Sequence, residues 1–181
     1  MKASVVKKRN KKPDVLWEEV ADIQCGPEEV LVDVFATAVN RADLLQALGF
    51  YPPPPGESEI LGLEMAGTIA AIGDAVQGRQ IGERVLALLS GGGYAQQAAV
   101  NHQMLIKLPA GWSFVEGAAI PEVWLTAFVN LFIEGTLKSG ETVLIHAGGS
   151  GVGTAGIQMA REAGARVYIT AGAEAKLDKC R

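Results

Sequence analysis

The sequence is poor in cysteine, and its two cysteines, Cys25 and Cys180, lie far apart in the chain. They form no C-x-x-C pair or other metal-ligand spacing, which argues against a zinc cluster and against a disulfide framework. Such sparse cysteine usage is typical of a reducing compartment. We therefore expect neither a structural metal nor a disulfide.

A strong charge of either sign is also lacking. Sixteen basic and 20 acidic side chains give a formal net charge of −4 and an isoelectric point near 5.2, whereas nucleic acids and anionic membranes select a basic surface. The one basic cluster, residues 7–12, lies between two short apolar stretches and is interpreted as a solvated turn joining two strands. Small molecules are the expected partners.

Long hydrophobic runs are absent. No apolar stretch approaches the roughly 18 residues needed to cross a bilayer, and no signal-like apolar region follows the basic residues. We expect a cytoplasmic protein. With 49% hydrophobic and 20% charged residues, the composition is that of a globular protein with enough apolar material for a core.

Short strand-like stretches alternate with Gly and Pro turns up to about residue 109, which is typical of a barrel or sandwich. We predict strands over 29–39, 66–72, 84–89 and 94–108, and one helix over 41–48. Residues 30–36 alternate with a period of two, as expected where one sheet face is more buried. Residues 52–55 are all proline and lack the donors of a central strand, so they must form an ordered loop.

After about residue 112 the pattern becomes that of an α/β protein. Ser113 and Glu116 form a capping-box pattern, and the apolar helix that follows, interrupted by Pro121, is expected to run to Gly135. A buried strand over 142–146, a helix over 152–163 and a strand over 166–170 then make one βαβ unit. We divide the chain into a barrel domain, residues 1–118, and an α/β segment, residues 119–181.

A glycine-rich turn joins the first buried strand to its helix. Backbone amides at a helix N-terminus can approach a pyrophosphate only where side chains are small, and the helix dipole favours negative charge there. Against the pattern G-x-G-x-x-G, this turn has Gly148, Ser150 and Gly153, with Gly151 beside the serine. We interpret it as a dinucleotide site; a tight turn of some other α/β protein is the alternative.

The end of the second strand indicates which cofactor to expect. NAD-binding proteins usually carry an acidic residue there for the ribose hydroxyls, but residues 170–173 read Thr-Ala-Gly-Ala. Lys176 follows within reach of a 2′-phosphate, and Glu174 is interpreted as a first-turn helix residue favoured by the helix dipole. NADPH is therefore the predicted cofactor, in preference to NADH.

Four motifs in order, at residues 40–43, 51–54, 62–67 and 147–153, resemble the quinone oxidoreductase branch of the medium-chain dehydrogenase/reductase superfamily. Residues 120–128 are similar to the p53-inducible quinone oxidoreductase-like proteins. The resemblance covers nearly the whole chain. It implies a GroES-like, barrel-shaped substrate domain followed by a Rossmann domain, a doubly wound parallel sheet, with the active site in the cleft between them.

The resemblance also bears on the chemistry. Zinc-dependent relatives hold a catalytic zinc with a cysteine near the position of Asn40 and with the histidine of a G-H-E motif; here Leu63 replaces that histidine and cannot bind a metal. We expect no metal, and a structural role for Glu64. The implied activity is NADPH:quinone oxidoreduction by direct hydride transfer, with an enone or alkenal acceptor as the alternative.

Individual residues receive roles by the same resemblance. Asn40 and Tyr51 would be catalytic hydrogen-bonding groups of the nicotinamide and substrate pocket. The cofactor-binding residues would be Thr126, Ser150, Gly151, Val152, Gly153, Gly172 and Lys176. Structural alternatives are that Asn40 satisfies backbone groups, that Tyr51 packs the proline loop and that Thr126 is an ordinary helix residue. His102 and His146 are expected to be structural.

In one respect the chain departs from the family. A doubly wound dinucleotide domain has six strands, whereas this sequence supplies two and ends inside the expected second helix. We therefore expect a truncated, incomplete NADPH-binding domain with an open strand edge. A non-catalytic barrel fragment that pairs with another chain is a further alternative, and a homo-oligomer is expected for the full-length protein.

Overall fold

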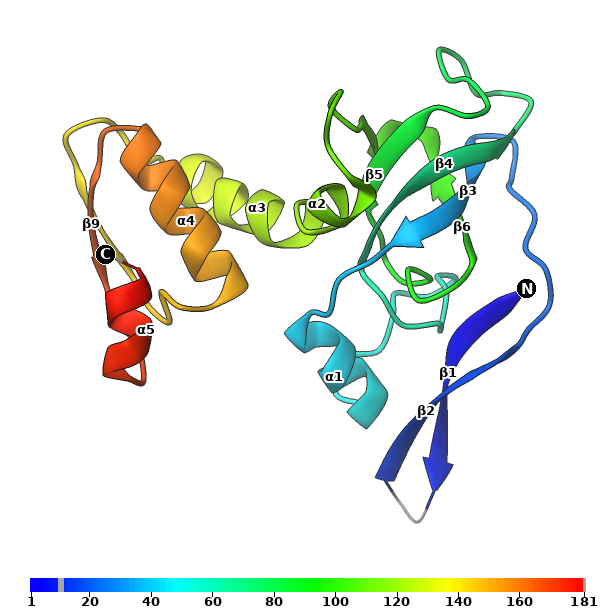
Figure 1. Ribbon diagram of the computed structural model, residues 1–181, viewed down its shortest axis with the longest axis horizontal. Helices are drawn as coiled ribbons and strands as arrows, with labels where there is room; N and C mark the ends of the chain where they lie inside the picture. Colours follow the sequence, from blue (N-terminus) through cyan, green and yellow to red (C-terminus); the bar gives the residue numbers. More distant parts are fainter. Residues whose placement is uncertain (10–11, 181) are drawn as a thin grey trace. The chain divides into compact units, whose positions relative to one another are not determined.

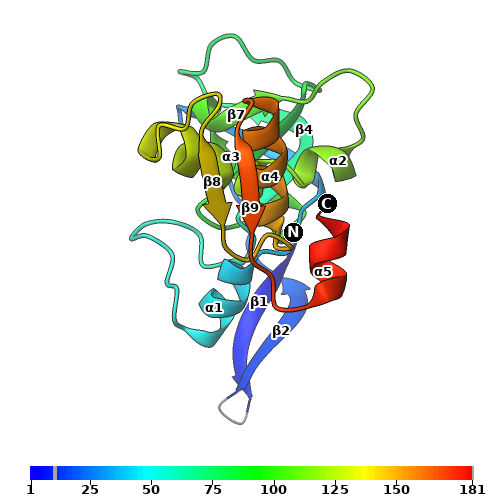
Figure 2. The ribbon, with the colours of Figure 1, turned by 90° about the vertical axis from the view of Figure 1, so that its left-hand side faces the viewer.

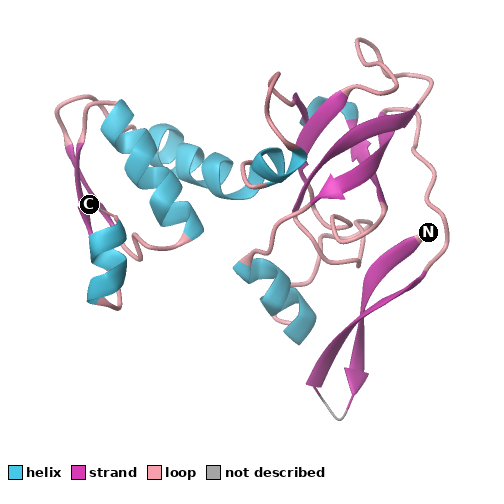
Figure 3. Ribbon diagram, in the orientation of Figure 1, coloured by secondary structure: helices cyan, strands magenta, loops and turns pink. Residues whose placement is uncertain are grey.

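The structure, a computed structural model, describes residues 1–9 and 12–180 and divides into two compact units, Met1–Pro121 and Glu122–Arg181. Unit 1 holds most of the strands and unit 2 is mainly helical (Figure 3). The elements up to residue 118 are β1 (Lys2–Arg9), β2 (Lys12–Glu19), β3 (Glu29–Ala36), α1 (Arg41–Leu48), β4 (Glu64–Ile72), β5 (Arg84–Leu88), β6 (Gln97–Asn101), the 3-10 turn η1 (His102–Met104), β7 (Leu105–Lys107) and α2 (Phe114–Ala118). Those that follow are α3 (Pro121–Phe128), the π-helical η2 (Val129–Glu134), β8 (Thr142–Ile145), α4 (Gly151–Glu162), β9 (Arg166–Ile169) and α5 (Glu174–Lys179).

The N-terminal strands β1 and β2 pair antiparallel, and residues 7–9 and 12 of the basic cluster belong to these strands, so the prediction that the whole cluster is a turn was wrong. The turn itself, at residues 10–11, lies outside the described residues. A backbone hydrogen bond from Ser4 N to Tyr94 O, 2.8 Å long, connects β1 to the remainder of unit 1.

A five-stranded antiparallel sheet in the order β6-β3-β4-β5-β7 forms the body of unit 1 and curls on itself (Figure 1). The pairing of β3 with β4 shifts register between Leu31 and Val32 and again between Val34 and Ala36. Such bulges bend a strand and increase its twist, which promotes the curl. The predicted barrel-type fold is confirmed as a half-barrel.

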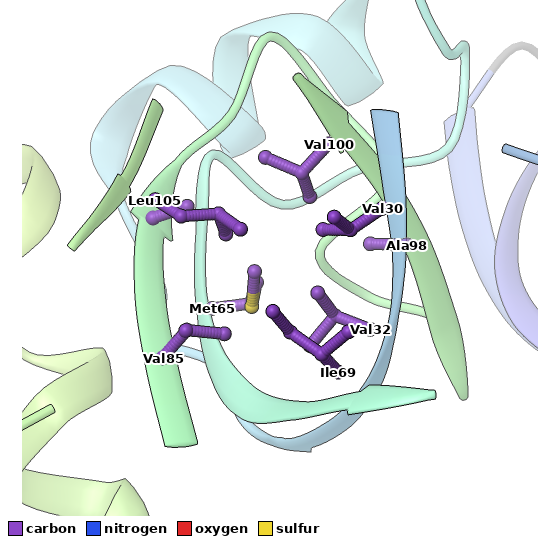
Figure 4. Packing of buried hydrophobic residues seen from close by; sticks show 9 residues of the cluster. Val30, Val32, Met65, Ile69, Val85, Ala98, Val100 and Leu105 are labelled. Atoms are coloured by element: carbon purple, nitrogen blue, oxygen red, sulfur yellow. The ribbon is translucent and has the colours of Figure 1, made fainter. Parts of the chain in front are cut away.

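The core of unit 1 lies inside this curl. Val30 and Val32 of β3 are fully buried, as the period of two predicts, and pack with Met65, Ile69 and Val85. Figure 4 shows these side chains directed toward one another from several strands. The cluster is completed by Ala87, Ala98, Val100 and Leu105.

The single strand expected over 94–108 is in fact two strands, β6 and β7, which lie at opposite edges of the sheet. Between them the Asn101 side chain accepts a hydrogen bond from the Gln103 amide (3.0 Å) and starts η1. This turn carries the chain from one edge to the other, which a continuous strand could not do. The prediction of one strand was therefore wrong.

The helix expected from Ser113 to Gly135 is interrupted once, at residues 119–120 just before Pro121. Ser113 and Glu116 form the predicted capping box, with the Glu116 amide donating to Ser113 Oγ at 3.2 Å, but α2 ends at Ala118. The chain becomes helical again at Pro121, because proline is well tolerated at the first helical position. The last turns widen into the π-helix η2, which ends before Gly135.

In unit 2, β8 and β9 pair in parallel and α4 connects them, so the predicted βαβ unit is confirmed (Figure 2). Val143 and Ile145 are half-buried, whereas Leu144 and Tyr168 are 56% and 61% exposed. The strand predicted to be buried over 142–146 is therefore only partly buried, because the face that carries Leu144 is exposed. Among residues 1–9 and 12–180, no helix is both long and apolar enough to span a membrane.

Candidate functional site

The first predicted catalytic residue, Asn40, lies at the N-terminus of α1 and is 9% exposed. Its side-chain Nδ2 donates to Oε1 of Glu64 at 2.7 Å, and its backbone N–H donates to Oδ2 of Asp43 at 2.7 Å. Asn40 therefore belongs to the N-terminal cap of α1, and its side-chain carboxamide is oriented by the hydrogen bond to Glu64. Its contact with substrate stays a prediction.

Asp43 and Tyr94 extend this cluster, and sequence reasoning assigned neither a role. The Tyr94 hydroxyl donates to Asp43 Oδ2 at 2.8 Å and lies 3.2 Å from the Ala38 carbonyl oxygen. Burial raises the pKa of Tyr94 above its ordinary value, and the hydrogen bond to Asp43 and the charges of Asp43 and Glu64 raise it further. The N-x-x-D spacing could have identified Asp43 as a cap, whereas no local pattern connects Tyr94 with it.

Leu63 and Glu64 occupy the positions that correspond to the zinc-binding motif, and they are 8% and 2% exposed. Leu63 offers no donor atom to a metal. Glu64 accepts from Asn40, and its backbone carbonyl accepts from Thr37 Oγ1 at 2.7 Å, so it is paired inside unit 1 as expected. Within the described part of the chain, no group of three or more His, Cys, Asp or Glu side chains could hold a metal ion.

The second predicted catalytic residue, Tyr51, lies in the loop that joins α1 to β4 (Figure 1). Its side chain is 49% exposed, and Leu48 and Phe50 beside it are 51% and 77% exposed. The ring is thus open to a ligand and is not buried under the proline loop. A hydrogen bond from Tyr51 to substrate stays a prediction.

Unit 2 carries the predicted phosphate-binding turn between β8 and α4. Ser150 caps α4, because its Oγ accepts a hydrogen bond from the Gly153 amide at 3.0 Å. Gly151 and Val152 occupy the first turn, where helix geometry leaves backbone N–H groups without intrahelical acceptors. The positive end of the helix dipole lies at the same place. The turn can therefore receive an anion such as a diphosphate.

At two positions of the turn, neighbouring atoms leave no room for a side chain, so glycine is required. A β-carbon on Gly153 would lie 2.5 Å from the Ala147 carbonyl oxygen, and one on Gly148 would lie 2.8 Å from the Ile169 side chain. These are the first and third glycines of the motif, of which the third allows close helix–strand packing. The middle position is free to be Ser150, which uses its side chain as the helix cap.

Lys176 of α5 lies against the turn. A β-carbon on Gly149 would come within 3.2 Å of Lys176 Cβ and 3.4 Å of its Cδ. Gly172, after β9, faces open space, since no described atom lies within 4 Å of the position of its β-carbon. Glu174 is the first residue of α5, in agreement with its prediction as a first-turn helix residue. The structure thus brings Lys176 to the turn.

Thr126 completes the predicted cofactor-binding set in unit 2, and His146, expected to be structural, lies at the end of β8. Thr126 is half-buried in α3, and its carbonyl oxygen accepts from Asn130 Nδ2 at 2.8 Å; its contact with a cofactor stays a prediction. Nδ1 of His146 lies 3.0 Å from Thr170 Oγ1, so this pair links the C-terminal ends of β8 and β9. The structural role expected of His146 stays a prediction.

Comparison with known proteins agrees with this architecture. Residues 26–110 match the family "Alcohol dehydrogenase GroES-like domain". The chain is 42% identical over 154 residues to a phenolphthiocerol synthesis polyketide synthase of Mycobacterium bovis, and 44% identical over 160 residues to an erythronolide synthase of Saccharopolyspora erythraea. These matches cover 85% and 87% of the chain but only 7% and 4% of the synthases.

Solved structures share the fold. The CurK enoyl reductase has a TM-score of 0.83 at 32% identity, with 91% of this chain and 52% of that chain covered. The quinone oxidoreductase of Escherichia coli, solved with NADPH, has a TM-score of 0.84 at 28% identity, with 92% and 51% covered. The chain therefore spans about half the length of these structures. Fold, domain match and neighbours together show that it belongs to the medium-chain dehydrogenase/reductase superfamily.

Proposed function

We propose that the chain forms part of an NADPH-dependent reductase that transfers hydride directly to an acceptor whose C=C bond is conjugated with a carbonyl group. The observation that carries this proposal is the turn before α4, where Ser150 caps the helix and Lys176 lies against Gly149. Helix N-termini bind diphosphates, and a lysine beside one can pair with a further phosphate.

Each residue of the turn has a distinct part in this proposal. The amides of Gly151 and Val152 bind the diphosphate, and the close-packed Gly153 keeps the helix against the strand. Lys176 binds the 2′-phosphate, which favours NADPH over NADH, and Gly172 leaves room for the ribose. Thr126 contacts the nicotinamide end. NADPH supplies the hydride when bound.

The acceptor follows from the residues at the position of the zinc site. With Leu63 there and the Asn40 amide donating to Glu64, residues 1–9 and 12–180 offer no metal donor set to polarise an unreactive carbonyl. The acceptor must already be electrophilic. Hydride addition to a conjugated C=C bond places negative charge on oxygen, where Asn40 and Tyr51 can donate hydrogen bonds and water can supply the proton.

Quinones and enones both satisfy this requirement. Similarity to the solved quinone oxidoreductases, which extends over nearly the whole chain, supports a quinone. The identities of 42% and 44% to polyketide synthases and the likeness to solved enoyl reductases support an enone or enoyl acceptor as the second candidate.

Titration of the purified chain with NADPH, followed by nucleotide fluorescence, tests the cofactor half of the proposal. We expect saturable binding, tighter for NADPH than for NADH. Turnover with a benzoquinone and with a crotonyl thioester, each in the presence and absence of a chelator, then distinguishes the two acceptors. A chain that gives no saturable signal with either nucleotide contradicts the proposal and leaves the non-catalytic barrel fragment.

A further inference from the structure

Asn40 is held from two sides by buried carboxyl groups. Its side-chain Nδ2 donates to Glu64 and its backbone N–H donates to Asp43, each at 2.7 Å, and both acids are 2% exposed. Because the Glu64 oxygen accepts this bond, the nitrogen of the carboxamide faces Glu64 and its oxygen faces away. The amide of Asn40 thus has one orientation where an isolated asparagine would have two.

The two acids are themselves fixed. Tyr94 donates to Asp43 at 2.8 Å, and Thr37 donates to the Glu64 backbone carbonyl at 2.7 Å. The loop before α1 is thereby connected to the start of β4 and to the segment before β6. Buried ionic groups contribute little net stability, since desolvation offsets their attraction. The main effect of this network is therefore on geometry.

We propose that Glu64 is a positioning residue, which sets the direction of the Asn40 carboxamide in the substrate site. The inference rests on the proposed function, because it assigns Asn40 to that site. An amide has two N–H donors, and with one committed to Glu64 the other has a fixed direction. Donors fixed in advance at the place where charge develops stabilise a transition state without reorganisation.

An exchange of donor and acceptor tests this role. In Asn40→Asp, two carboxyl groups meet in the core, and we expect a clearly lowered melting temperature. In the double variant Asn40→Asp/Glu64→Gln, the glutamine amide can donate to the new carboxylate, so the melting temperature should return toward that of the wild type. The donor presented to substrate is lost all the same, so kcat should stay reduced by about tenfold to a hundredfold, the effect of one charge-assisted hydrogen bond. Wild-type kcat in the double variant would overturn the proposal.

The single variant Glu64→Gln supplies the positioning readout. The introduced glutamine side chain can either accept from or donate to Asn40, so we expect a reduced kcat with an unchanged affinity for NADPH, and side-chain amide resonances of Asn40 in ¹⁵N NMR spectra that shift or double. If the wild-type chain shows no turnover, the proposed function fails while the NMR comparison still decides the inference. Asn40 resonances that are identical in the wild type and in Glu64→Gln refute it.

Discussion

Gly153 faces Ala147 across the turn before α4, and a β-carbon on Gly153 would lie 2.5 Å from the Ala147 carbonyl oxygen. That oxygen also accepts a hydrogen bond from the Ser150 amide at 2.8 Å, so it cannot move away freely. Ala147 has a φ of 54°, in the left-handed region that non-glycine residues seldom adopt. The shape of the turn is thus determined by contacts within the backbone.

Gly153→Ala should destabilise unit 2. The added methyl group overlaps backbone atoms, and such overpacking costs about 1–3 kcal/mol, against a gain of at most about 1 kcal/mol in helix propensity. Gly172→Ala is the matched control, because its β-carbon would meet no described atom within 4 Å. Thermal unfolding followed by circular dichroism should show a lower melting temperature for the first variant only. Equal melting temperatures for both would refute the steric account.

Substitutions at Ser150 should separate helix capping from anion binding. Ser150→Ala removes the hydroxyl that accepts from Gly153 and should cost about 1 kcal/mol of stability. Ser150→Asp keeps a good cap and suits the helix dipole, so its stability should match the wild type. Its charge repels a diphosphate, so its dissociation constant for NADPH should rise about tenfold or more. Unchanged NADPH affinity in Ser150→Asp would exclude the turn as the diphosphate site.

Lys176→Ala should reduce the preference for NADPH. Loss of a charge-assisted hydrogen bond to the 2′-phosphate should raise the NADPH dissociation constant about tenfold, while NADH binding changes little. Lys179→Ala, on the same helix, is the control. Fluorescence titrations with both nucleotides measure the ratio. A parallel loss for NADPH and NADH would mean that Lys176 acts on the turn as a whole.

The stability of unit 1 should fall at alkaline pH because of Tyr94. Its pKa in the folded chain is raised above the ordinary value of about 10. The folded state therefore keeps the phenol proton longer, and the stabilisation is complete below about pH 10 and decreases as the pH rises toward the raised value. Tyr94→Phe should be about 1 kcal/mol less stable at neutral pH, since it lacks the hydrogen bond to Asp43. Urea unfolding from pH 7 to about 11.5 should show the two curves converging; parallel curves would contradict the assignment.

Local patterns predicted the elements that depend on neighbours in sequence. Helix α1, the capping box of Ser113 and the βαβ unit were all predictable, because periodicity and caps act over a few residues. The split of residues 94–108 was missed, because it depends on one Asn101 hydrogen bond and on which sheet edge the chain reaches next.

The candidate site shows the same division. The turn was recognised from its small residues. Lys176 was predicted to lie near the cofactor because it follows the second strand of the βαβ unit, and it lies against Gly149 of the turn. The network around Asn40 could be predicted only in part, because Glu64 and Tyr94 reach it from segments distant in sequence. Side-chain partners across such distances leave no spacing pattern that a single sequence reveals.

The exposed side chains of Leu144 and Tyr168 have a consequence for how the chain opens. A two-stranded parallel sheet with one uncovered face has few tertiary contacts to oppose local unfolding. The β8–β9 ladder should therefore open more often than the β3–β4 ladder, which pairs at the centre of a five-stranded sheet. In deuterated water, the amide protons of β8 and β9 should therefore exchange faster than those of β3 and β4. Binding of a ligand to the turn before α4 should slow the exchange in β8 and β9.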